Sequence, residues 1–157
     1  MGESNQVAYT SRVRIERKSG PMRLAYLPAE KEPVIFGVHS EVAEHYKVSP
    51  DAYPPHATTL DYVVAAAAGG LTGTFGGALE ARQIDASNDR LSSEANGEIE
   101  LDGNVLVIRR IHVRYKLRAS ADQRETIERV HNVHARYCPV ARSLEGAIGI
   151  RTSLELV

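Results

Sequence analysis

The sequence predicts one α+β domain over residues 1–157, and three observations support this prediction. Stretches of alternating apolar and polar residues, typical of strands, lie before and after a long apolar segment that has the composition of a helix. These strands are grouped along the chain instead of alternating singly with helices, which favours α+β over a doubly wound sheet. With 157 residues, of which 43% are hydrophobic, the chain is long enough to bury one core.

An N-terminal β-meander is predicted from three short segments. In the first, Val13 and Ile15 alternate with arginines, which is the pattern of a half-buried strand. The turn residues Ser19, Gly20 and Pro21 separate it from the second segment. The three predicted strands are residues 7–16, 22–26 and 34–38.

A long central helix is predicted over residues 58–82. Thr58 and Asp61 have the spacing of a capping box, and a long apolar run follows them. The helix contains five glycines, each of which costs about 1 kcal/mol relative to alanine. Close packing against a second helix is the expected compensation. Because residues 62–79 are mostly Ala, Gly and Thr, we predict a buried helix of a soluble protein and not a membrane span.

A β-hairpin, a second helix and a last strand complete the predicted fold. Residues 90–101 and 105–118 flank a turn at residues 102–104. In the second hairpin strand we expect one apolar face, made of Val105, Val107, Ile111, Val113, Tyr115 and Leu117. The helix over residues 121–137 has an inward stripe of Ile127, Val130, His131, His134 and Cys138. Alternating residues 148–156 form the last strand.

Composition narrows the function classes. The formal net charge is −1, so we expect no nucleic-acid or membrane partner, and the basic strand residues after residue 109 are expected to face solvent. The single cysteine, Cys138, excludes an internal disulfide. Residues 1–6 show no basic stretch followed by an apolar run, so a cytoplasmic location is expected. No cofactor and no metal are predicted.

Two segments together resemble a known family. In residues 65–72, Ala-Ala-Ala-Ala-Gly-Gly-Leu-Thr, small residues precede the place where the family has a cysteine on its central helix. Cys138-Pro139-Val140 resembles the second cysteine of the family, which is typically followed by Pro-Val. With the order of the elements, this pattern resembles the OsmC/Ohr family of osmotically inducible and organic hydroperoxide resistance proteins.

The resemblance implies a fold, an assembly and an activity. OsmC/Ohr proteins are intertwined homodimers in which the central helices of two subunits pack together beneath sheets completed across the dimer. They reduce organic hydroperoxides in oxidative stress defence. The first cysteine attacks the peroxide as a thiolate and becomes a sulfenic acid, the second resolves it as a disulfide, and an external dithiol reduces the disulfide.

This sequence departs from the family at the first cysteine. The resemblance places Leu71 at that position, where it has no nucleophile and lines an apolar pocket or fills the core. The carboxylate that supports the thiolate corresponds to Asp61, ten residues earlier, and the arginine corresponds to Arg12 or Arg14. The standard two-cysteine cycle is therefore not expected of this chain.

Cys138 is the remaining candidate for redox chemistry. His131 and His134 precede it on the same helix face and are possible thiol partners, as in a Cys–His pair. The alternatives are an inert buried thiol, which we favour, and a metal site from the three residues together. Two functions follow: a thiol enzyme altered from the hydroperoxide reductases, or a non-catalytic homodimer that binds a small apolar ligand at its interface.

Overall fold

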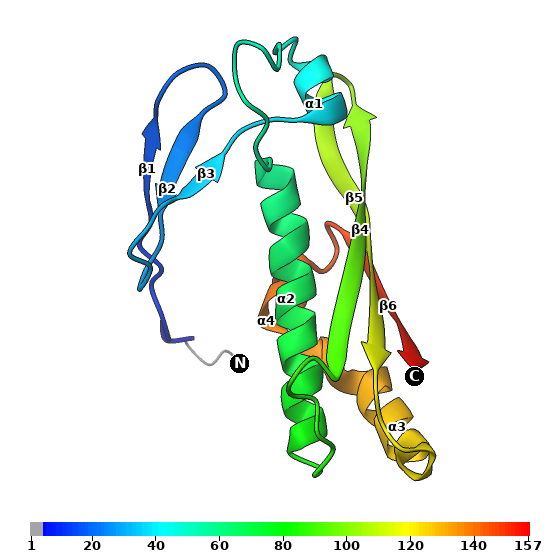
Figure 1. The fold of residues 1–157 in the computed structure, drawn as a ribbon. Helices are drawn as coiled ribbons and strands as arrows, with labels where there is room; N and C mark the ends of the chain where they lie inside the picture. The colour runs from blue at the N-terminus through cyan, green and yellow to red at the C-terminus, as the bar shows by residue number, and fades with distance from the viewer. Residues whose placement is uncertain (1–4) are drawn as a thin grey trace. The chain divides into compact units, whose positions relative to one another are not determined.

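The computed structural model describes residues 5–157. The chain forms two compact units, Met1–Thr59 and Leu60–Val157. Helices and strands are both present, which confirms the predicted α+β class (Figure 1). That the units form one domain stays a prediction. The elements are β1 (Arg14–Arg17), β2 (Arg23–Tyr26), β3 (Val34–Phe36), α1 (Ser40–His45), α2 (Thr59–Glu80), β4 (Leu91–Asp102), β5 (Val105–Leu117), η1 (Ala121–Gln123), α3 (Arg124–His134), η2 (Ala135–Tyr137), α4 (Pro139–Leu144) and β6 (Gly149–Leu156).

The first unit contains the predicted meander. Strands β1, β2 and β3 form an antiparallel sheet in that order, with Ala25 of β2 paired to both neighbours and fully buried. The prediction that the first strand starts at Val7 was wrong, because β1 begins at Arg14. The β1–β2 ladder ends where Arg14 pairs with Tyr26, since β2 stops before Pro28. A β-strand extends only as far as it has a partner strand to pair with, so Val7 and its neighbours lie outside the sheet.

The second unit is a three-stranded sheet with helices. Its strand order is β4-β5-β6, in which β4 and β5 form the predicted hairpin and β6 lies parallel to β5. A parallel neighbour requires a crossover connection, and α3 and α4 supply it. In Figure 1 the long α2 runs along this sheet. This arrangement matches the predicted order of hairpin, second helix and last strand.

The core of the second unit lies where α2, β5 and α3 meet. On α2 the buried residues recur every fourth position, as Ala67, Leu71, Phe75 and Leu79. On β5 they are the alternate residues from Ile111 to Leu117, and on α3 Ile127, Val130 and His134 are buried. Helical and strand periodicities each therefore present one apolar face to the same interior.

The predicted apolar face of the second hairpin strand was wrong in its first part. Pairing shifts between Glu98 and Ile99, so that Ile99 pairs with Ile108 while Glu98 pairs with Arg110. This β-bulge places one extra residue in β5, and the faces exchange there. Ile108 consequently packs against the core, whereas Val105 is 62% exposed. Val107, which was also predicted to face the core, lies on the same face of β5 as Val105.

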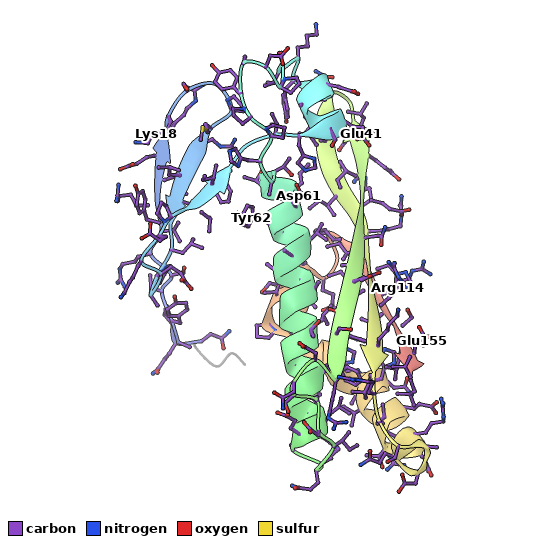
Figure 2. The ribbon with its side chains drawn as sticks, viewed as in Figure 1. Lys18, Glu41, Asp61, Tyr62, Arg114 and Glu155 are labelled. Atoms are coloured by element: carbon purple, nitrogen blue, oxygen red, sulfur yellow. The ribbon has the colours of Figure 1, made fainter. Side chains whose placement is uncertain are left out.

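The opposite face of the sheet is charged. Arg110 pairs with Glu100 and with Glu98, and these contacts, Glu100 first, raise the pKa of the Arg110 guanidinium. Arg114 is 3.6 Å from Glu94, and the Arg114 and Glu155 side chains both point away from α2 (Figure 2). Carboxylates of β4 thus offset the basic residues of β5, as expected of a solvated face.

Helix α2 is the only helix in the described residues that is long and apolar enough to cross a membrane. Length and composition alone are weak indications, because the core helix of a soluble protein has the same features. Here one side of α2 carries the core residues Leu71 and Phe75. The other side is rich in glycine and alanine, which give little free energy of transfer into hydrocarbon. Within one chain 22% of the apolar window is buried, all of it on the core side.

Candidate functional site

Cys138 lies at the junction between η2 and α4. The backbone is extended at this residue, and Pro139 is the first residue of α4. Proline is favoured at this position, because the backbone N–H that it lacks would have no partner within the helix. The Cys138 side chain is fully buried, and its Sγ accepts a hydrogen bond from the Ala141 N–H at 3.5 Å. The thiol therefore acts as the cap of α4 and has no surface exposed in a single chain.

The α2 residue that faces this thiol is Gly70. A β-carbon built on Gly70 would lie 3.1 Å from Cys138 Sγ and 3.6 Å from the Val140 side chain. Successive helix residues are rotated by about 100°, so Leu71 points elsewhere. It is fully buried in the core cluster of the second unit. The absent side chain of Gly70 thus makes room for the Cys138 sulfur.

The two histidines of the α3 stripe have partners other than the thiol. His134 donates from Nδ1 to the His131 carbonyl, at 2.6 Å, so its Nε2 accepts from the Tyr115 hydroxyl at 2.8 Å. His131 Nε2 lies 3.0 Å from Thr152 Oγ1 of β6. Within residues 5–157, neither imidazole is hydrogen-bonded to Cys138. The possible thiol partners are therefore occupied as structural groups of the core.

An aromatic cluster surrounds these histidines. The Phe75 ring lies 4.7 Å from the Tyr115 ring and 4.9 Å from the His134 ring, and His131 stacks on His134 at 5.3 Å. Burial lowers the pKa of His131 and of His134, which favours neutral imidazoles. Burial, and then the negative charge of a Cys138 thiolate, raise the pKa of Tyr115. Both histidines and the Tyr115 hydroxyl are therefore favoured in their neutral forms in this interior.

We expect the protein to lose stability as the pH falls below about 6.5, the usual pKa of histidine. His131 and His134 have lowered pKa values when folded, so the unfolded chain binds more protons between those values and 6.5. The contribution of the two neutral histidines to the free energy of unfolding is therefore fully present above this pH window and decreases within it. Melting temperatures between about pH 7.5 and about pH 5.5 measure the effect. The decrease should be smaller in His134→Gln, and an equal decrease in both proteins would contradict this explanation.

Asp61, the predicted carboxylate, lies far from Gly70 along α2. Asp61 is exposed in the first turn of α2, nine residues before Gly70 (Figure 2). That separation corresponds to about 14 Å along the helix axis. Arg12 is exposed and precedes β1 in the first unit, and Arg14 contacts Glu16.

Sequence reasoning missed two residues of this site. Gly70 was one of five helix glycines, and only its distance to Cys138 distinguishes it. Tyr115 was predicted to face inward, and a buried tyrosine hydroxyl generally needs a hydrogen-bond partner. That rule pointed to a polar residue on a neighbouring element, which is His134. Among residues 5–157, no group of three or more side chains has the arrangement of a metal site.

Comparison with known proteins identifies a family and a shared fold. The model of a family described as OsmC-like protein matches residues 52–153. The organic hydroperoxide resistance protein OhrB of Bacillus subtilis has a similar crystal structure, with a TM-score of 0.67 and 14% identity, over 95% of this chain and 100% of that chain.

Two further crystal structures are similar. An OsmC-like protein of Mycoplasma pneumoniae gives a TM-score of 0.65 at 12% identity, over 96% of this chain and 98% of that chain. An organic hydroperoxide resistance protein OsmC of Legionella pneumophila gives 0.66 at 10% identity, over 96% and 99%. No curated protein matches the sequence. At these identities the structures establish the fold that the chain shares with them.

Proposed function

This chain belongs to the OsmC-like protein family, and we propose that it is an oxidative-stress protein related to the thiol-dependent organic hydroperoxide reductases, without their two-cysteine cycle. The family match spans residues 52–153, which includes α2 and Cys138. Two of the similar structures are named as organic hydroperoxide resistance proteins. The retained thiol and the missing nucleophile define what this chain can do.

The contact between Gly70 and Cys138 carries the proposal. In a disulfide, the β-carbon of one cysteine lies about 3 Å from the sulfur of the other. The β-carbon position of Gly70 is 3.1 Å from Cys138 Sγ. We therefore place the lost first cysteine at residue 70, one position before Leu71. Leu71 then corresponds to the core residue that follows it, which agrees with its complete burial.

Without a thiol at residue 70, the first chemical step has no attacking group. In that step a thiolate takes the distal oxygen of the hydroperoxide, the O–O bond breaks, and the alkoxide is protonated to an alcohol. Cys138 does not replace the missing group, because its sulfur is buried and caps α4. Thiols in such surroundings are generally unreactive. The cycle thus stops before any sulfenic acid forms.

The test is peroxide consumption by the wild-type protein. Cumene hydroperoxide and excess dithiol are mixed with the purified chain, with Cys138→Ser as the control. We expect both proteins to consume peroxide at the same background rate. Loss of peroxide that disappears in Cys138→Ser would instead make this chain a one-cysteine peroxidase, with an external thiol as its resolving group.

We also propose a homodimer joined through α2. Ala65, Ala66, Gly69, Gly73 and Gly77 are exposed on the side of the helix opposite its core face. A β-carbon at Gly69, Gly73 or Gly77 would meet no atom within 4 Å. Small residues in this arrangement allow two helix backbones to approach closely, and the packing would offset the low helix propensity of glycine.

A second candidate function is a binding module for a small apolar ligand. The open side of α2 borders a groove of about 480 Å³, lined by Gly69, Thr72 and Gly73 among others and by Leu91 and Ser93 of β4. A partner subunit on the same side would enclose it. If peroxide consumption stays at background, this groove is the place to seek a ligand. In either function we place the protein in the cytoplasm, where a single thiol stays reduced.

A further inference from the structure

A second pocket lies on the second unit, where η2, α4 and the start of β6 meet. Its volume is about 610 Å³, within the range of about 300–1,000 Å³ that is typical of ligand sites. Ala135, Ala141, Ile148 and Ile150 form its apolar wall. Ala141 also belongs to the surroundings of the thiol, because its N–H donates to Cys138 Sγ, but the sulfur itself is buried and faces Gly70 of α2.

The polar lining of this pocket has an excess of positive charge. Arg136 and Arg142 line it together with Tyr137 and one carboxylate, Glu145. Within residues 5–157, neither arginine has a carboxylate within 4.0 Å. The arginines of α3 differ, since Arg124 pairs with Glu128 and Arg129 with Glu125. Two guanidinium groups beside one pocket thus keep their hydrogen-bond donors available.

Tyr137 adds an aromatic surface to the same pocket. It is 73% exposed, the most exposed large apolar side chain of the second unit. Tyrosine and arginine are enriched among the residues that dominate binding energy, and here both types lie beside an apolar wall. Guanidinium groups bind carboxylates through bidentate hydrogen bonds. Burial of an apolar group against the isoleucines is also favourable, because it removes apolar surface from water.

We propose that this pocket binds a small amphipathic anion, a carboxylate carried on an apolar body. The carboxylate contacts Arg136 and Arg142, and the apolar body lies against Ile148 and Ile150. Glu145 opposes the ligand charge and favours anions with a single charge over multiply charged ones. This binding goes beyond the proposed function, because it requires neither Cys138 nor a second thiol.

The test uses octanoate and octanol, which share one apolar body and differ in charge. Each is titrated into the full chain by calorimetry, and backbone amide shifts locate the site. We expect octanoate to bind with a Kd below about 1 mM and to shift residues 135–150, and octanol to bind at least about tenfold more weakly. Arg136→Gln and Arg142→Gln should each weaken octanoate binding about five- to tenfold. Glu145→Gln should strengthen it.

Arg151→Gln is the matched control. Arg151 is exposed and lies next to Ile150 on β6, but it does not line this pocket. The substitution removes the same charge and should leave octanoate binding unchanged, as should Cys138→Ser. The proposal would be overturned by equal binding of octanol, by an equal effect of Arg151→Gln, or by no octanoate binding at millimolar concentration.

Discussion

Gly70→Cys is expected to form a disulfide with Cys138 and to consume organic hydroperoxide. The new β-carbon lies 3.1 Å from Cys138 Sγ, which is about the distance that a disulfide requires. In the reduced protein this contact is close, so oxidation also relieves crowding. Helix propensity does not oppose the change, since cysteine is a better helix former than glycine.

The expected reaction has two steps that balance. The thiolate introduced at residue 70 takes one oxygen from the hydroperoxide, giving a sulfenic acid and an alcohol. The Cys138 thiol then attacks the sulfenic sulfur, so that a disulfide forms and water leaves. An added dithiol reduces the disulfide and permits another turnover.

Three measurements check this result. Thiol titration should find both cysteines reduced before the peroxide is added and none afterwards. The oxidised variant should be more stable than the reduced one by roughly 2–4 kcal/mol, because the disulfide closes a long loop. With dithiol present, peroxide loss should exceed the wild-type rate more than about tenfold.

Leu71→Cys is the matched control for the position of the new thiol. The Leu71 side chain leaves α2 about 100° away from the direction of residue 70, so a cysteine there should not pair with Cys138. Leu71 is also fully buried, so a thiol at this position should not reach a peroxide. The double variant Gly70→Cys, Cys138→Ser should stop at the sulfenic acid. If Leu71→Cys formed the disulfide and Gly70→Cys did not, residue 71 would hold the first-cysteine position and our assignment would be wrong.

Gly73→Leu is expected to dissociate the proposed homodimer while leaving the single chain folded. A β-carbon at Gly73 meets nothing within 4 Å in one chain, so the larger side chain fits there. Between two closely packed helices the same side chain overpacks the interface, which destabilises the dimer by about 1–3 kcal/mol for each copy. A symmetric dimer contains two copies, so its Kd should rise at least roughly thirtyfold.

Sedimentation of both proteins over a range of concentrations measures this change. Asn132→Leu places the same side chain on an exposed position of α3 and should not alter the dimer. A monomeric wild-type protein would contradict the proposal. In that case Gly73→Leu should only raise the melting temperature, because leucine has the higher helix propensity by about 0.8 kcal/mol.

Much of this fold could be predicted from local pattern. The alternation after residue 109 placed Ile111 to Leu117 on the core face of β5, and the three- and four-residue steps on α3 identified its buried side. These predictions succeeded because each depends on neighbours in one element, whose side-chain directions follow from the period.

Other features depend on contacts between elements. The length of β1 is set by β2, which ends at Tyr26, and not by the apolar residues that precede Arg14. Likewise the bulge opposite Glu98 turned Val105 away from the core, although Val105 fits the apolar alternation. A sequence pattern contains no information on where a partner strand stops or shifts.

The sequence by itself determined the fold class and the family. It did not determine which helix residue faces Cys138, nor which groups satisfy His131 and His134. Adjacent helix positions such as Gly70 and Leu71 differ by about 100° in direction. Only the packing of α2 against the chain around Cys138 selects between them. The tertiary structure decided the site because its geometry is set between elements that are distant in sequence.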